Sequence, residues 1–176
     1  MQEDKEGGLR LMTLGEIALA KSVFGEKISY NKVWIHHDSY LPFGLQHERV
    51  AMTPNGEIYY RTALYRDDFS VESMYAKHTF IHELSHVWQR ERGVCVICRG
   101  LVSWLASYRY VLDGRLLSEY PMEQQAQIIA DSYALKNYGY LIWRELKKNK
   151  VVTLDDSLDE SSLQKNYANV LRGFPW

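Results

Sequence analysis

The feature that most constrains this chain is the run His82-Glu83-Leu84-Ser85-His86, which lies inside a segment predicted to be one continuous helix, residues 74–92. Two histidines four positions apart on a helix lie one turn above each other, as two ligands of a tetrahedral zinc ion do. The glutamate between them points to the adjoining face, where it can accept a proton from a water molecule without binding the metal. The pattern therefore predicts the active core of a zinc hydrolase, most often a peptidase.

The sequence around the motif agrees with this interpretation. Apolar side chains recur with helical spacing on one sector of the predicted helix: Met74, Phe80, Ile81, Leu84, Val87 and Trp88. His82 and His86 fall on the neighbouring sector, so the helix has a core-facing side and a separate edge for the site. The alternative is that both are hydrogen-bonded histidines on a half-buried helix, since short motifs also occur without function.

A catalytic zinc ion needs a third protein ligand, with the fourth position left for water. His78 extends the histidine face by one turn. However, residues i and i+8 of a straight helix lie about 12 Å apart along the axis, so three such histidines cannot converge on one ion. We interpret His78 as a residue that contacts a metal ligand without binding the metal, or as a surface residue. Substrate positioning is a lesser alternative.

The third ligand is predicted downstream, in a helix that follows Pro121. Glu123, Gln127 and Asp131 recur every fourth residue and form a polar stripe, bordered by alanines that would let another helix approach closely. We expect Glu123 to be the ligand, and Gln127 or Asp131 to orient a ligand histidine by a hydrogen bond. Asp131 is the main alternative ligand and Glu119 a weaker one. The stripe would also suit a merely solvent-exposed face.

Length and composition suit one globular domain, because 176 residues with 46% hydrophobic content can bury a sizeable core. We assign residues 1–8 to a linker or frayed end and residues 9–176 to the domain. The formal net charge of −1 gives no long-range attraction to nucleic acid or to anionic lipid. No apolar run is long enough for membrane insertion, and the charged N-terminus lacks the order of a secretory signal. We expect a chain made in the cytoplasm that would need another route of export.

Two cysteines, Cys95 and Cys98, form a single Cys-x-x-Cys pair. A structural zinc site would need a second pair of ligands at similar spacing, and the sequence has none. A redox motif is the alternative, although the segment lacks the strand-to-helix setting of a thioredoxin-like unit. The apolar neighbours of both residues favour buried thiols.

The remaining patterns indicate an α+β fold that is rich in helix. Thr13-Leu14-Gly15-Glu16 has the form of a capping box, ahead of a helix that ends at Gly25. Residues 33–36 are a strand candidate, and residues 50–60 have the turn chemistry of a β-hairpin. Residues 101–112 fit either a strand or a helix, and residues 158–173 predict a last amphipathic helix. We expect a small antiparallel sheet beside the motif helix, whose hairpin holds an extended substrate or is purely structural.

Four stretches carry a resemblance to a known family. The run from Phe80 to Gln89 and the later Met122-Glu123-Gln124-Gln125-Ala126 resemble the zinc metallopeptidase effectors of bacterial type VI secretion. These effectors occur as C-terminal extensions of valine-glycine-repeat (VgrG) spike proteins and as separate vgr-related proteins. Residues 14–20 and 51–59 are also similar, so the likeness extends to about residue 138.

This resemblance implies a zincin-like fold with a gluzincin-type site, in which zinc is held by His82, His86 and Glu123. It also implies an antibacterial toxin that a type VI system delivers into the target-cell periplasm. A cognate immunity protein and a VgrG spike are then the expected partners, besides a protein or peptide substrate.

The predicted mechanism is metal-assisted hydrolysis of a peptide bond. Zinc polarises the scissile carbonyl and activates a water molecule, while Glu83 moves the proton from that water to the leaving amine. Tyr133, His36 and His37 are the residues considered for stabilising the oxyanion, and no pattern selects among them. Three hypotheses remain at this stage: a protein-cleaving toxin, a hydrolase of peptidoglycan peptides, and a non-catalytic binding module that zinc stabilises.

Overall fold

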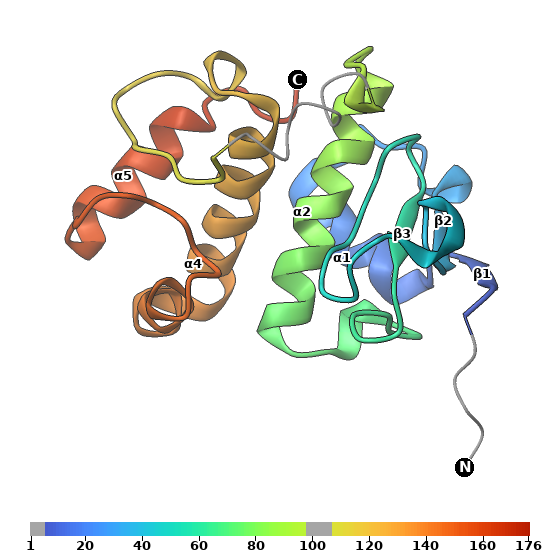
Figure 1. Cartoon of the computed structure of the whole chain (residues 1–176). Helices are drawn as coiled ribbons and strands as arrows, with labels where there is room; N and C mark the ends of the chain where they lie inside the picture. Colours follow the sequence, from blue (N-terminus) through green and yellow to red (C-terminus); the bar gives the residue numbers. More distant parts are fainter. Residues whose placement is uncertain (1–5, 98–106) are drawn as a thin grey trace.

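The computed structural model describes residues 6–97 and 107–176. These residues contain four α-helices and a three-stranded sheet, which confirms a helix-rich α+β fold. Figure 1 shows α1 (Leu14–Phe24) and the sheet on one side of α2 (Met74–Glu91), with α4 (Met122–Lys148) and α5 (Glu160–Val170) on the other. Helix α2, which carries the His82–His86 motif, is therefore the central element. None of the helices in this part of the chain is long and apolar enough to cross a membrane.

The sheet is mixed, whereas the sequence predicted an antiparallel one. Strand β1 (Gly8–Leu11) pairs antiparallel with β2 (Trp34–His37), but β2 pairs parallel with β3 (Ile58–Tyr60). The reason is that the chain between β2 and β3 returns to the starting end of β2 before β3 begins.

The predicted hairpin over residues 50–60 is reduced to one residue pair. Met52 and Tyr59 exchange both backbone hydrogen bonds, at 3.1 and 2.8 Å. The pairing does not continue toward the turn, because Pro54 has no N–H to donate. The side chain of Thr53 hydrogen-bonds to Glu83 of α2 instead. The segment is thus held at a single point beside β3.

Residues 6–8, which the sequence assigned to a linker, contact the sheet. The Glu6 carboxylate accepts a hydrogen bond of 2.6 Å from Nε of Arg61, and the N–H of Gly7 donates to the carbonyl of His37 at 2.8 Å. Gly8 is already part of β1.

The region around the two cysteines differs from its prediction. Cys95 is exposed and disulfide-bonded, so the prediction of a buried thiol is wrong for this residue. Cys98 and residues 101–106, the first half of the segment 101–112, lie outside the described residues. Further along, Tyr110 forms a parallel bridge with Leu154.

The helices begin and end where local chemistry predicts. Thr13 and Glu16 form the capping box of α1, and Gly25 ends that helix with a φ of 56°. The Ser73 hydroxyl accepts a hydrogen bond from the first turn of α2. Helix α4 begins directly after Pro121 and continues to Lys148, with a kink at Gly139.

Helix α2 packs its apolar sector into the core and its polar sector against α4. Phe80, Ile81 and Leu84 are fully buried, as the spacing predicts. On the α4 side, the three alanines that border the polar stripe are also fully buried: Ala126, Ala130 and Ala134. Small side chains let the two helix backbones approach closely, which brings the polar residues of both helices together.

Buried Asp131 joins α4 to three other segments. Its Oδ1 accepts hydrogen bonds from Nε2 of His78 in α2 at 2.7 Å and from Nε2 of Gln127 at 2.9 Å. Its Oδ2 accepts from the hydroxyl of Tyr110 at 2.8 Å and from the N–H of Thr153 at 3.1 Å. The carboxylate has no solvent exposure, so these four donors replace its water of hydration.

We predict that Asp131→Ala lowers the free energy of unfolding by about 3 kcal/mol or more, because several buried donors would lose their acceptor at once. Urea unfolding followed by circular dichroism measures this difference. Asp155→Ala is the matched control, since Asp155 is half-exposed and pairs with Arg109 at the surface. It should leave stability nearly unchanged. Equal losses in the two variants would contradict the role given to Asp131.

Candidate metal centre

Three side chains from α2 and α4 converge on one point. Oε2 of Glu123 lies 3.4 Å from Nε2 of His82 and 3.2 Å from Nε2 of His86. One potential ligand atom from each of the three residues lies within 4.8 Å of the other two. Each residue is less than 10% exposed. The helix spacing thus brings the two histidines together, and the packing of α4 on α2 adds the carboxylate between them.

The spacing of these atoms fits a metal ion better than it fits a pair of charge-assisted hydrogen bonds. Charge-assisted N–H···O bonds are about 2.7–2.9 Å long, which is shorter than both distances here. Two ligand atoms that are each about 2.1 Å from a tetrahedral zinc ion lie about 3.4 Å from each other. The donor set of two imidazole nitrogens and one carboxylate oxygen is also one that zinc accepts. The residues present therefore fit a zinc ion.

Gln89 fixes the orientation of one candidate ligand and ties it to the other helix. Its Oε1 lies 2.8 Å from Nδ1 of His86, so Nδ1 carries the proton and Nε2 keeps its lone pair for a metal. Its Nε2 donates to the carbonyl of Met122 at 2.9 Å and to Oε1 of Gln125 at 3.2 Å. A single buried side chain thus positions His86 and the first turn of α4, where Glu123 lies.

The charges of the cluster are strongly coupled. Burial alone would raise the pKa of Glu123, but its contacts with His82 and His86 lower the pKa well below its usual range. Burial alone would lower the pKa of His86, but the contact with Glu123 raises it to about 9. The carboxylate is therefore ionised, and it favours positive charge at the imidazoles, as either a proton or a metal cation.

Glu83 lies beside the cluster without joining it. Its carboxylate accepts a 2.6 Å hydrogen bond from Oγ1 of Thr53, and both residues are buried. Thr53 follows Met52, whose backbone is fixed to Tyr59. The sheet side of the molecule thus holds one oxygen of Glu83 in place.

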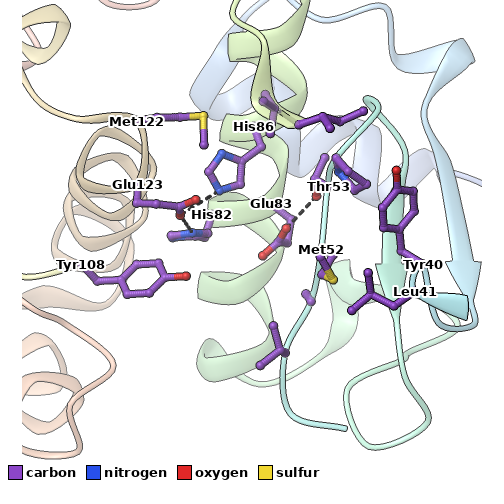
Figure 2. A pocket seen from close by; sticks show the side chains of 15 residues that line it. Tyr40, Leu41, Met52, Thr53, His82, Glu83, His86, Tyr108, Met122 and Glu123 are labelled. Carbon is purple, nitrogen blue, oxygen red and sulfur yellow. Dashed lines mark hydrogen bonds and ion pairs between the residues drawn. The ribbon is translucent and has the colours of Figure 1, made fainter. Parts of the chain in front are cut away.

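The three candidate ligands, Glu83 and Thr53 all line one cleft of about 270 Å³. Figure 2 shows Glu123, Tyr108 and Met122 on the α4 side of the cleft, with Thr53, Met52 and Leu41 on the opposite side. The histidines and Glu83 project from α2 between the two walls. A substrate in this cleft would therefore lie directly against the candidate metal ligands.

Tyr108 presents its phenol group to the same centre. Its ring lies 5.8 Å from the ring of His82, and its hydroxyl points into the cleft in Figure 2. Burial and the nearby carboxylates of Glu123 and Glu83 raise the pKa of Tyr108 to about 12. The hydroxyl therefore keeps its proton at neutral pH and can donate a hydrogen bond to a bound carbonyl oxygen.

The other residues considered from the sequence lie elsewhere. Asp131 and Gln127 bond to each other, and Asp131 bonds to His78, so their hydrogen bonds do not orient either ligand histidine as we expected. His78 is itself buried. Glu119 bonds to the backbone N–H of Leu116, which removes it as an alternative ligand.

The residues considered for the oxyanion are also outside the cleft. Tyr133 contacts Tyr138, whereas His36 pairs with Glu57 at 2.6 Å and His37 lies 3.0 Å from the hydroxyl of Thr62. Tyr108, by contrast, lines the cleft and lies beside the ring of His82.

Sequence reasoning missed three residues of this site. Gln89 has a local signal, because it lies three positions after His86 and hence on the same side of the helix. Thr53 and Tyr108 have no such signal, since each approaches the centre only through the tertiary fold.

Comparison with known proteins places the chain in a family. No family model matches it. The chain is 34% identical over 180 residues to the type VI secretion system spike protein VgrG2b of Pseudomonas aeruginosa, in an alignment that covers 98% of this chain. It spans only 16% of the length of that spike protein. The solved effector domain of Pseudomonas aeruginosa VgrG2b is similar at 33% identity with a TM-score of 0.68, over 88% of this chain and 89% of that domain. This chain therefore belongs to the family of type VI secretion effector domains that includes the effector domain of VgrG2b.

Proposed function

We propose that this effector domain is a zincin-like, zinc-dependent metallopeptidase of the gluzincin type, in which His82, His86 and Glu123 hold the metal. The observation that carries the proposal is the pair of distances from Oε2 of Glu123 to the two Nε2 atoms, 3.2 and 3.4 Å. These are edge lengths of a tetrahedral zinc site and are longer than charge-assisted hydrogen bonds. A buried glutamate beside the cluster supports hydrolysis over a purely structural metal.

Residues of the chain supply the other parts of a hydrolytic mechanism. When bound, zinc would polarise the scissile carbonyl and lower the pKa of the attacking water to about 7. Glu83 accepts the proton of that water and passes it to the leaving amine. Thr53 holds Oε2 of Glu83, so that Oε1 is left to face the water. Tyr108 donates a hydrogen bond to the oxygen on which negative charge develops.

The similarity to VgrG2b supports export by a type VI system, and the rest of the biological setting is part of our proposal. A type VI system would deliver this domain, either with a VgrG spike or as part of one, and its target would be the periplasm of a competing bacterium. A periplasmic toxin can also reach the periplasm of the cell that makes it, so a cognate immunity protein would bind the domain there. The cleft in front of the metal centre is the site that such a protein would have to block.

The first prediction concerns metal content. The purified wild-type chain should bind one zinc ion, and Glu123→Gln should lower zinc affinity by more than about 100-fold, since even residues behind the ligands contribute 10- to 100-fold. Metal analysis after dialysis and competition with a chromogenic chelator measure both quantities. His36→Ala is the matched control, because His36 pairs with Glu57 away from the cleft and should keep full zinc occupancy. Unchanged zinc binding in Glu123→Gln would remove Glu123 from the site.

The second prediction separates catalysis from structural metal binding. Glu83→Gln keeps the size of the side chain but cannot accept a proton, so hydrolysis of a denatured protein substrate should fall by at least about 100-fold. Zinc occupancy and thermal stability should stay near those of wild type. Wild-type activity in the Glu83→Gln variant would exclude this residue as the base. Toxicity in target cells that survives the change would favour a non-catalytic binding module.

The third prediction concerns the orientation of the base. In Thr53→Val the new side chain has nearly the shape of threonine but no hydroxyl, whereas Thr53→Ser keeps the hydroxyl. Loss of one hydrogen bond to a carboxylate should lower kcat by about 10-fold or more in Thr53→Val, with KM little changed. Thr53→Ser should retain most of the activity. Steady-state kinetics test the pair, and equal activity in both variants would show that the hydroxyl has no role.

A further inference from the structure

We infer that the cleft selects polypeptide substrates with a large apolar side chain next to the scissile bond, and disfavours the charged stem peptides of the cell wall. This inference rests on the proposed peptidase function and names the substrate class of the same site. It decides between two hypotheses that the sequence leaves open, a protease and a peptidoglycan hydrolase.

The first observation is the chemistry of the cleft walls. The charged and metal-binding groups are concentrated at the metal centre, and apart from Tyr40 the walls on both sides of it carry mainly apolar side chains: Leu41, Val50, Met52, Val96, Ile97 and Met122. Figure 2 shows Leu41 and Met52 facing the cleft across from Met122. An extended peptide whose carbonyl reaches the centre must therefore place its neighbouring side chains against apolar surface.

The second observation is that part of this apolar surface is open to solvent. Val50 is 46% exposed and Ile97 is 39% exposed, although both line the cleft. Leu41 and Met52 are partly exposed as well. An apolar substrate side chain would remove this surface from water, which is favourable in proportion to the area covered. A small side chain such as that of alanine would cover little of it.

The third observation concerns charge. The two carboxylates of the cleft, on Glu83 and Glu123, formally balance the two positive charges of a zinc ion. None of the described residues that line the cleft is a lysine or an arginine. A charged substrate side chain would thus lose hydration against the apolar walls without gaining an ionic partner among the described lining residues, which is costly. Stem peptides carry free carboxylates and amines and small alanine side chains, so they fit these walls poorly.

The fourth observation is that the wall containing Leu41 is fixed before substrate binds. Buried Gln46 accepts a hydrogen bond from the N–H of Tyr40 at 2.9 Å and donates to the carbonyls of Val50 and Tyr59, at 2.7 and 3.0 Å. The loop around Leu41 is therefore tied to the same strand residue that pairs with Met52. A wall with a fixed shape discriminates between side chains better than one that adapts to each.

The experiment uses internally quenched decapeptides of neutral sequence with one variable position, which is leucine, alanine, glutamate or lysine. Zinc-loaded wild-type chain should cleave the leucine peptide beside the variable residue, with kcat/KM at least about 100-fold above that of the glutamate peptide. Mass spectrometry of the products locates the cleaved bond. Titration calorimetry of the same peptides with the Glu83→Gln variant gives a readout without turnover, and the leucine peptide should bind more tightly there too.

A charge placed in the wall tests whether these residues cause the preference. Leu41→Arg should lower cleavage of the leucine peptide and raise that of the glutamate peptide, so that their ratio falls by about 10-fold or more. Leu141→Arg is the matched control, because Leu141 is 78% exposed and does not line the cleft. The control should leave the ratio unchanged.

The outcomes distinguish failure of this inference from failure of the proposed function. Cleavage of none of the peptides, nor of any denatured protein, by a zinc-loaded chain would overturn the peptidase itself. Cleavage with equal kcat/KM for the leucine and glutamate peptides would overturn only the apolar preference. Release of stem peptides from purified sacculi, faster than cleavage of the leucine peptide, would likewise overturn the preference for polypeptides.

Discussion

The contact of the Glu123 carboxylate with two imidazoles across the α2–α4 interface is the interaction on which the candidate site depends. It joins a motif helix to a residue about forty positions later in the chain, so it exists only when both halves of the fold are assembled. The distances of 3.2 and 3.4 Å leave the carboxylate near both rings but at the spacing expected around a metal ion. The roles proposed for Glu83, Thr53 and Tyr108 depend on their positions relative to this contact.

The interface does not rely on the metal ligands alone. Two turns of α4 beyond Glu123, Asp131 gathers four hydrogen bonds and joins the same two helices through His78. Gln89 makes a further link, from His86 to the first turn of α4. Because these contacts need no metal, the ligands would be held in place before an ion binds. Preorganisation of this kind lowers the cost of binding the ion and fixes the geometry that catalysis requires.

The sequence predicts the part of the site that is local and leaves out the part that is not. Helical geometry alone sets the spacing of His82, Glu83 and His86 on one helix. The polar residues that recur at every fourth position from Glu123 to Asp131 likewise identified the stripe of α4 that faces α2. The polar residues of this stripe have other partners than we expected. Asp131 pairs with His78, and His86 is oriented by Gln89, which lies on α2 and outside the stripe. The parallel pairing of β2 and β3 depends on the path of the chain that connects them. The alternation of apolar residues along a strand does not predict that path.

The segment that includes Met52 and Thr53 links substrate selection to the orientation of the base. Its backbone is fixed by the pair of hydrogen bonds between Met52 and Tyr59, and both of its side chains line the cleft. Thr53 restrains the carboxylate of Glu83, whereas Met52 forms part of the apolar wall. A displacement of this segment would therefore alter the position of the base and the shape of the substrate site together. A variant such as Thr53→Val, which keeps the volume of the side chain, is able to separate the two effects because it removes the hydroxyl without moving the wall.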